Sequence, residues 1–421
     1  MSSGNKHKYF TDPIHGLVSV PKGLVLKLVD HAYVQRLRRI RQLGLGYLVF
    51  PGSEHSRFSH AIGAMALMQR VINSLKDKNT TITRAEHEAV LIGILLHDIG
   101  HGPFSHTLEQ TIIQDFHHEM MTLALMRKLN DEFNGELTLA IDIFSGQYKK
   151  QFLHQLISSQ LDMDRLDYLK RDSFYSGVLE GSIGVDRILK TMRIFQGNVV
   201  IEKKGIYAIE NYITARRLMY MQVYQHKTVL SADKLLRSIL QRAIDVLSQG
   251  GQLFIPSPAL EFFLRERPSA KKGLTNKIIN AYTQLDDNDI LMAIKCWEKS
   301  EDVVLSDLCN RFLTRRFFRT TFLKSELSEK NEKQIRSKTT QALKHIKLPH
   351  DEEFLKYYLF KDSVVNEAYR YDTESIWVME DENTAVEFSR ASETRSITAL
   401  TQSVVKPYII HLKELDTSGI I

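Results

Sequence analysis

Apolar residues recur at intervals of three and four through much of this chain, a spacing that places them on one face of a helix. Between Ser59 and Leu75 they include Ile62, Met65 and Met68. The chain has nine prolines and none between residues 103 and 256, which favours long helices there. The pattern predicts helices over residues 59–75, 84–96, 155–168, 185–194 and 210–249, the last long enough to be a central or interface helix.

Short strand-like runs interrupt this helical pattern. Strands are predicted at 17–20, 198–202 and 404–412, and a hairpin at 374–379 and 384–388. The turn residues Gly250-Gly251 and Pro256-Ser257-Pro258 mark an internal boundary. The chain is therefore predicted to be mainly α, with a helical core over 1–250, a helical segment over 251–350 and a small α+β region over 351–421.

Composition indicates an ordinary globular protein, because 43% of the 421 residues are hydrophobic and 25% are charged. No apolar run is long enough to span a membrane and no signal-peptide core is present, so a cytoplasmic location is expected. Cys296 and Cys309 form no zinc or disulfide pattern. The net charge of +6 is mild. Basic clusters at 36–41 and 311–319 fit either solvated helix faces or a polyphosphate or nucleic-acid surface.

The candidate chemistry centres on histidine and aspartate. Eight of the 16 histidines lie between residues 55 and 118. His60, the pair His97-Asp98, and Asp164 fall on three predicted helices and make a mixed nitrogen and oxygen ligand set for one divalent metal. His97 directly follows a buried apolar run, where a polar cluster is costly unless it is paired or metal-bound. Sites of this type accept magnesium, manganese, iron, zinc or nickel, so the metal stays open.

Further residues near these ligands suit hydrolysis of a phosphate ester, which needs an activated water, charge neutralisation and an acid for the leaving oxygen. His118 is the candidate acid, Glu109 its orienting carboxylate, and His101 the other candidate for proton transfer. Asp162 is predicted to orient a ligand histidine. Arginines and tyrosines that suit a polyphosphate are Arg57, Arg165, Tyr168, Arg216 and Tyr224.

Eight short segments of the chain together resemble the motifs of one family. They are Asp12–Gly16, Gln35–Arg38, Gln42–Gly44, Phe50–Gly52, His55–His60, His97–His106, Asp162–Asp172 and Tyr224–Lys227. In this order they resemble the HD-domain deoxynucleoside triphosphate triphosphohydrolases, including the bacterial enzymes and the catalytic core of the animal sterile-alpha-motif/HD-domain enzyme. The resemblance implies an HD-domain helical core and a reaction that cuts a dNTP into deoxynucleoside and tripolyphosphate.

The resemblance also implies roles for individual residues. His60, His97, Asp98 and Asp164 match the metal ligands, and His118 matches the general acid beside His101. The phosphate contacts are matched by Arg57, His106, Arg165, Tyr168 and Arg216. Gln42 and Asp172 match the pair that reads the 3′-hydroxyl, while Leu43 and Tyr224 match residues that would clash with a 2′-hydroxyl. Exclusion of a hydroxyl by apolar shape alone is worth roughly a hundredfold.

Regulation is implied by the same resemblance, because the animal enzyme is a tetramer with nucleotide activators between subunits. Asp30, Gln35 and Arg38 match its guanine-reading positions, and Arg315 and Arg319 match its phosphate contacts. The expected partners are therefore a dNTP substrate, a nucleotide activator and further copies of this chain in a homotetramer. Thr11 replaces an asparagine of the animal enzyme, which leaves the activator's identity open, and Glu109 replaces an aspartate, which keeps the carboxylate.

Two other readings stay open. The chain could be an HD phosphohydrolase for another nucleotide, such as a monophosphate, a cyclic nucleotide or an alarmone, although the sugar-reading set argues against this. It could also be a non-catalytic HD protein that binds nucleotide or nucleic acid, supported by its pI near 9.0 and its arginine clusters. The complete ligand set argues against that reading, so nucleic acid is not expected as the main partner.

Overall fold

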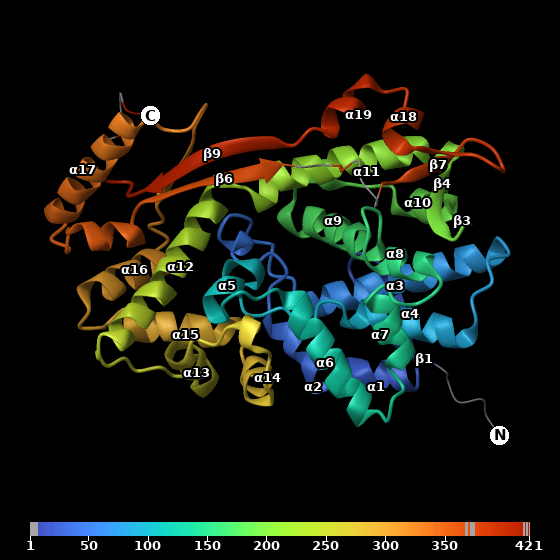
Figure 1. Ribbon diagram of the computed structural model, residues 1–421, viewed down its shortest axis with the longest axis horizontal. Helices are drawn as coiled ribbons and strands as arrows, with labels where there is room; N and C mark the ends of the chain where they lie inside the picture. Colours follow the sequence, from blue (N-terminus) through green and yellow to red (C-terminus); the bar gives the residue numbers. More distant parts are fainter. Residues whose placement is uncertain (1–6, 367–368, 371–374, 416, 418–419, 421) are drawn as a thin grey trace.

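The computed structural model describes residues 7–366, 369–370, 375–415, 417 and 420. At the centre of its N-terminal half lie two long helices, α3 (Arg57–Asp77) and α4 (Arg84–Leu96), which pack against each other (Figure 1). Each begins at a hydroxyl cap: Ser56 accepts the Ser59 amide, and Thr83 forms a capping box with Glu86. Because the connection between them is short, the start of α3 lies beside the end of α4.

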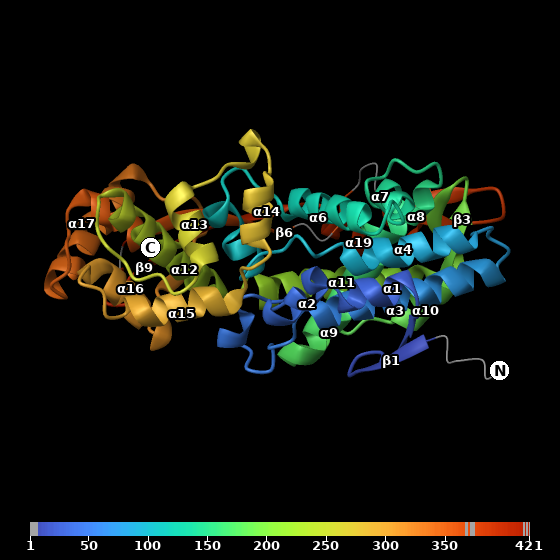
Figure 2. The same ribbon diagram turned by 90° about the horizontal axis from the view of Figure 1, so that it is seen from below.

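Some of the other helices lie around this pair, and the later ones, from α12 to α17, lie toward the opposite end of the long axis of the molecule (Figure 2). Those before residue 200 are α1 (Leu24–Asp30), α2 (Ala32–Arg36), α5 (Glu109–Ile112), α6 (His118–Glu132), α7 (Thr138–Phe144), α8 (Gln151–Ile157), α9 (Met163–Ser176) and α10 (Val185–Thr191). Those after it are α11 (Ile206–Met219), α12 (Lys227–Ser248), α13 (Pro258–Glu266), α14 (Asn276–Tyr282), α15 (Asp287–Trp297), α16 (Val303–Leu313), α17 (Glu329–His345), α18 (Phe388–Ala391) and α19 (Arg395–Leu400). The prediction of a mainly α protein is confirmed.

Three predicted helices have different bounds in the structure. The helix expected over 155–168 is broken after α8, because Asp162 accepts the Arg165 amide and starts α9 as its N-cap. The helix expected over 210–249 is broken at a π-helical turn, Tyr220–Tyr224, and α12 restarts with the His226 ring accepting the Thr228 amide. The helix expected over 185–194 ends early because Met192–Phe195 forms a strand.

The strands form three small sheets. A hairpin joins β1 (His7–Asp12) to β2 (Gly16–Pro21). A second sheet has the order β3 (Met192–Phe195), β4 (Asn198–Glu202), β7 (Trp377–Met379), β8 (Ala385–Glu387), and a third has β5 (Arg319–Phe322), β9 (Val404–His411), β6 (Phe360–Asn366). The predicted strands at β2, β4 and β9 and the β7–β8 hairpin are confirmed, except that position 374 lies outside the described residues. The strands β1, β3, β5 and β6 were not predicted.

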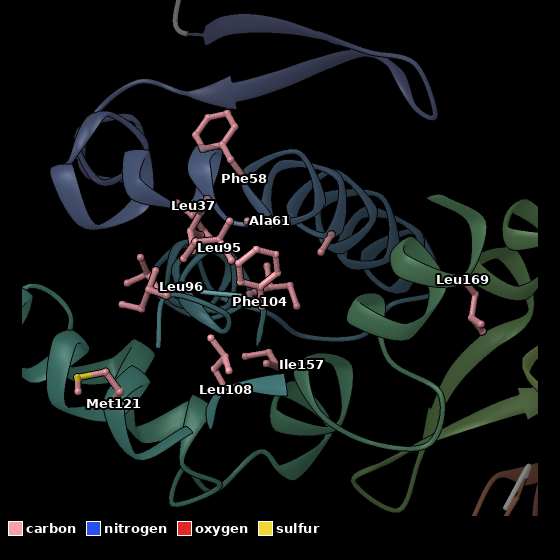
Figure 3. Packing of buried hydrophobic residues seen from close by; sticks show 14 of the residues in the cluster. Leu37, Phe58, Ala61, Leu95, Leu96, Phe104, Leu108, Met121, Ile157 and Leu169 are labelled. Carbon is pink, nitrogen blue, oxygen red and sulfur yellow. The ribbon is translucent and has the colours of Figure 1, made fainter. Parts of the chain in front are cut away.

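Buried side chains from most of these elements form one large hydrophobic cluster. Figure 3 shows part of it around Leu37, Ala61 and Leu95. The cluster continues past the turn after α12, where α12 packs against α16 and β4 pairs in parallel with β7. The division of the chain at residue 250 stays a prediction. In the described part of the chain, no helix has the length and apolarity needed to cross a bilayer.

Candidate metal centre and adjoining pocket

Three ligand atoms from three helices converge at one point. His60 lies in the first turn of α3, His97 caps the end of α4, and Asp164 lies in the first turn of α9. The His60 Nε2 atom is 3.3 Å from His97 Nε2 and 3.0 Å from Asp164 Oδ1, and the last two atoms are 3.5 Å apart. Ligands bound to one metal at about 2.1 Å lie about 3 to 3.5 Å from each other. The three residues therefore have the spacing of a metal site.

Asp98, the fourth predicted ligand, lies at the edge of this cluster. Its carboxylate oxygens are 3.4 Å from His97 Nε2 and 3.8 Å from His60 Nε2. The same carboxylate is paired with Arg57 and lies 3.3 Å from His101 Nε2. Asp98 therefore lies between the metal cluster, the name used here for the ligand side chains of His60, His97 and Asp164, and the basic side chains of Arg57 and His101.

The ring nitrogens that face away from the centre indicate how the histidines fit a metal. His60 Nδ1 lies 2.8 Å from an oxygen of Asp167, and His97 Nδ1 lies 2.6 Å from the Ile94 carbonyl oxygen. A proton held on each Nδ1 leaves the Nε2 lone pair directed at the shared space, which is the arrangement of metal-binding histidine. The donor set therefore fits a divalent cation.

The carboxylate that orients His60 is Asp167, to which the sequence analysis assigned no role. The prediction that Asp162 orients a ligand histidine is wrong, because Asp162 caps α9. Asp167 is fully buried and also contacts His15 at 2.6 Å and Arg171 at 2.8 Å. Both partners lie in segments that the motif pattern included without assigning them a role.

The charges around the centre also favour a cation. Burial acts to lower the pKa of His60, but hydrogen bonds with Asp164 and Asp167 outweigh it and raise the pKa to about 10. Despite burial, the two ligand histidines lower the pKa of Asp164. Buried carboxylates gathered around two imidazoles thus create a site that is stabilised by positive charge.

A second group of histidines lies next to the centre. Glu109 contacts two of them, with one oxygen 3.1 Å from His118 Nδ1 and the other 3.0 Å from His106 Nδ1. These hydrogen bonds lower the pKa of Glu109 although burial opposes them. The His101 ring stacks on His118 with 3.8 Å between centroids, and burial together with Arg57 lowers the His101 pKa well below its usual value. The three imidazoles could themselves hold a cation.

Asp98 and Asp164 of the first group and the three imidazoles of the second line one cavity of about 460 Å³. Its lining brings together twelve of the predicted site residues: Gln42, Leu43, Arg57, Asp98, His101, His106, His118, Asp164, Arg165, Tyr168, Asp172 and Tyr224. Asp233 and Arg237 of α12 line it too, and sequence reasoning missed both. Burial raises the pKa of Asp233 to about 6, and Thr107 donates a hydrogen bond to its carboxylate at 2.7 Å.

The residues predicted to read the sugar lie together at one side of this cavity. The Tyr224 hydroxyl donates to an oxygen of Asp172 at 2.8 Å, and the other oxygen of Asp172 is 2.7 Å from His55 Nε2. The Gln42 side-chain oxygen is buried and has no hydrogen-bond partner among the described residues. An unpaired buried acceptor is costly, which is expected at a position that awaits a ligand.

The remaining predicted phosphate contacts differ in position. The Arg165 Nε atom donates to the Ser159 carbonyl at 2.6 Å, which fixes the guanidinium at the cavity wall. Arg216 is buried on α11 and is not among the cavity's lining residues. Its Nε and Nη1 atoms have no hydrogen-bond partner within the described part of the chain. Arg216 could therefore reach a ligand only after a change in side-chain conformation or in its surroundings.

The residues predicted to bind an activator do not form one contiguous group through contacts in the described structure. Arg38 donates to the Gln35 side-chain oxygen at 2.8 Å and stacks over Phe58, 3.6 Å from the ring centroid. Asp30 pairs with a lysine of β1 at 3.6 Å. Arg315 donates to the Leu48 carbonyl, and Arg319 is exposed on β5. The activator site stays a prediction.

The basic clusters are partly internal. Arg36 is buried and donates to the carbonyl oxygens of Leu285, Ile99 and His101, at 2.8, 3.3 and 2.9 Å. Arg311 is buried against Asp307 and Glu414, at 2.8 and 3.0 Å. Arg36 thus holds the loop after α4, and neither arginine is available to a nucleic acid.

Comparisons with known proteins show which family the chain belongs to. The HD domain family matches residues 57–172, which contain all four predicted metal ligands, and the HD associated region matches residues 183–253. A curated protein of Bacillus subtilis, the uncharacterized protein YwfO, is 38% identical over 324 residues, which cover 75% of this chain and 72% of the relative.

Two further similar proteins are a triphosphohydrolase and a phosphohydrolase. The human deoxynucleoside triphosphate triphosphohydrolase SAMHD1 is 26% identical over 331 residues, which cover 68% of this chain and 50% of that protein. The crystal structure of a phosphohydrolase, BT4208 from Bacteroides thetaiotaomicron, is 44% identical with a TM-score of 0.91, covering 96% of this chain and 99% of that one.

Proposed function

Because the chain belongs to the HD-domain family, we propose that it is a metal-dependent hydrolase that cuts a deoxynucleoside triphosphate into deoxynucleoside and tripolyphosphate. One observation carries the proposal: Asp98 and Asp164 of the candidate metal site, the His118 ring and three arginines all line a single cavity. A volume of about 460 Å³ suits a small-molecule ligand. The human relative is a deoxynucleoside triphosphate triphosphohydrolase and the Bacteroides relative a phosphohydrolase, which supports a phosphate-ester substrate.

The metal would be held by His60, His97, Asp98 and Asp164, and when bound it would supply an activated water and neutralise phosphate charge. The chain's own residues bind and orient the substrate. Arg57 and Arg165 present guanidinium groups to the phosphates, and Asp167 keeps the His60 ring in place.

Proton transfer to the leaving oxygen is assigned to His118. Glu109 holds its Nδ1 atom, so Nε2 is the nitrogen free to donate. His101 stacks against it, and its lowered pKa favours a neutral ring that does not compete for the proton. His106, held by the other oxygen of Glu109, is a phosphate contact in this scheme.

The preference for a deoxyribose is assigned to four side chains. Gln42 and Asp172 would bind the 3′-hydroxyl, and the unpaired oxygen of Gln42 supports this role. Leu43 and Tyr224 would occupy the space of a 2′-hydroxyl, and the bond from Tyr224 to Asp172 holds the phenol ring in position. A phosphohydrolase for another nucleotide would not need this group.

The direct test is incubation of the purified protein with each dNTP and each NTP, with magnesium or manganese and with or without dGTP. The expected products are deoxynucleoside and tripolyphosphate from dNTPs, with no cleavage of NTPs. Release of a monophosphate or diphosphate would instead assign another phosphohydrolase activity, and no turnover with any ion would favour a binding protein.

Tyr224→Ala is expected to admit ribonucleotides, because it removes the ring that would collide with a 2′-hydroxyl. The ratio of kcat/KM for a dNTP to that for the matching NTP should fall by roughly ten- to a hundredfold. Tyr224→Phe is the matched control, since it keeps the ring and removes only the hydrogen bond to Asp172. Continued exclusion of NTPs by Tyr224→Ala would rule out the steric explanation.

The proposal includes activation by a nucleotide within a homotetramer, and Arg38→Ala is expected to weaken both. Arg38 is not among the lining residues of the catalytic cavity, so the metal content should be unchanged. Light scattering with and without dGTP would measure assembly, and elemental analysis would measure the metal. A tetramer that forms equally well in Arg38→Ala would contradict this assignment.

A further inference from the structure

A second cavity, of about 430 Å³, lies between α8, the β3–β4 hairpin and β7, on the side of the molecule where these labels gather in Figure 1. None of its lining residues lines the catalytic cavity. It is nearly as large as that cavity, and it is formed by segments that are far apart in the sequence. No role has been assigned to it above.

The lining of this second cavity mixes polar and apolar residues, and its one titratable side chain among the described residues is His154. It presents side-chain amides together with two aromatic rings: Gln151, Gln155, Gln196, Asn198, Phe195 and Trp377. Among the described lining residues there is no lysine, arginine, aspartate or glutamate. A triphosphate needs cationic partners, so this lining favours an uncharged ligand.

The two kinds of side chain suit a planar heterocycle. Trp377 is 40% exposed, whereas the other tryptophan, Trp297, is 1% exposed. An exposed indole next to amides can stack on a ring while the amides donate and accept at its edge. Gln155 is already bonded to Val199 and Asn198. The Gln196 side chain has no hydrogen bond among the described residues and is the free amide.

We propose that this cavity binds an uncharged nucleoside. The choice of a deoxynucleoside rests on the proposed function, because that reaction releases an uncharged deoxynucleoside beside a polyanion. The site would therefore take a product of the chain's own reaction and exclude its charged substrate.

One turn of the chain, before α9, lies between the second cavity and the catalytic site. Ser158 and Ser159 of this turn line the second cavity. The Ser159 amide donates to Asp162 at 2.8 Å, and its carbonyl accepts from Arg165 at 2.6 Å. Arg165 in turn lines the catalytic cavity beside Asp164. A ligand that shifts this turn shifts a phosphate-binding side chain, so occupancy should change the KM for a dNTP.

Binding is tested by calorimetry with deoxyadenosine, deoxyguanosine, deoxycytidine and thymidine, each added to the full chain without substrate. At least one should bind saturably. Trp377→Ala and Gln196→Ala should each weaken binding about tenfold or more, as expected for a lost stacking ring or amide. Gln249→Ala, an exposed glutamine after α12, is the matched control and should bind normally.

Gln196 is exposed at the tip of a hairpin, so its variant tests the site even if Trp377→Ala does not fold. Absence of binding, or binding that both variants leave unchanged, would overturn the proposal. The binding measurement does not require catalysis. Its outcome can therefore be distinguished from a failure of the proposed hydrolysis.

A kinetic arm separates the new cavity from ordinary product inhibition. The bound deoxynucleoside should change the KM for a dNTP in the wild-type protein, and this effect should be lost in Gln196→Ala. An equal effect in both proteins would place the deoxynucleoside in the catalytic cavity and overturn the coupling.

Discussion

His97→Ala is expected to abolish turnover, lowering kcat by about 10³-fold or more, because it removes one of three ligand atoms that meet within 3.5 Å. The remaining two ligands of the cluster, with Asp98 at its edge, hold a divalent ion less tightly. Metal content, measured by elemental analysis after dialysis, should fall along with activity. This second readout separates loss of the ion from a general loss of the reaction.

His87→Ala is the matched control for this substitution. His87 lies on the same helix and is half-buried, but it is not part of the metal cluster. Circular dichroism should show that both variants keep their helices, because the capping box at the start of α4 is intact in each. Near-normal activity and metal content in His97→Ala would remove the proposed centre.

His118→Ala is expected to lower kcat by about 10²- to 10⁴-fold, the usual contribution of a general acid, with a much smaller change in KM. His118 is not one of the ligands assigned to the catalytic metal, so the ion held by His60, His97 and Asp164 should be retained. Single-turnover kinetics with a dNTP would assign the loss to the chemical step.

The neighbouring His117 provides a matched control, because it is exposed and immediately precedes His118. His117→Ala should keep wild-type kinetics. Glu109→Gln should lower kcat less than His118→Ala does, because an amide still contacts the ring but no longer stabilises its charge. Equal activity in His118→Ala and His117→Ala would exclude His118 as the acid.

Local patterns in the sequence were sufficient for the two helices that carry the ligand histidines. The spacing of apolar residues predicted α4 with the bounds found in the structure, so His97 was expected at its end. The same reasoning failed for residues 155–168. An aspartate within a segment whose apolar residues have helical spacing can either continue the helix or cap a new one. Asp162 takes the second course.

The break makes Asp162 a helix cap, so Asp162 does not support the metal site. Asp164 and Asp167 lie three residues apart on one face of α9, and both contact His60. Asp162 faces Arg165 instead. Spacing along the chain places Asp164 and Asp167 on one helix face, but it cannot show that this face meets His60 of α3.

The two basic clusters show that the sequence does not reveal whether a charged residue is buried. A run of arginines looks alike in the sequence whether it is solvated or internal. Arg36 is buried because carbonyl oxygens from two distant segments, around Ile99 and Leu285, meet its guanidinium. Only the packing of the folded chain brings such acceptors together. The number of arginines in the two clusters therefore overestimates how many can contact a polyanion.

By itself, the sequence determined the helical class and the two helices that carry the candidate ligand histidines, because the spacing of apolar residues is a local property. The tertiary structure alone decided that His60, His97 and Asp164 meet, that Asp167 orients His60, and that a second cavity adjoins the turn before α9. These features depend on contacts between residues far apart in the chain, which no local pattern contains.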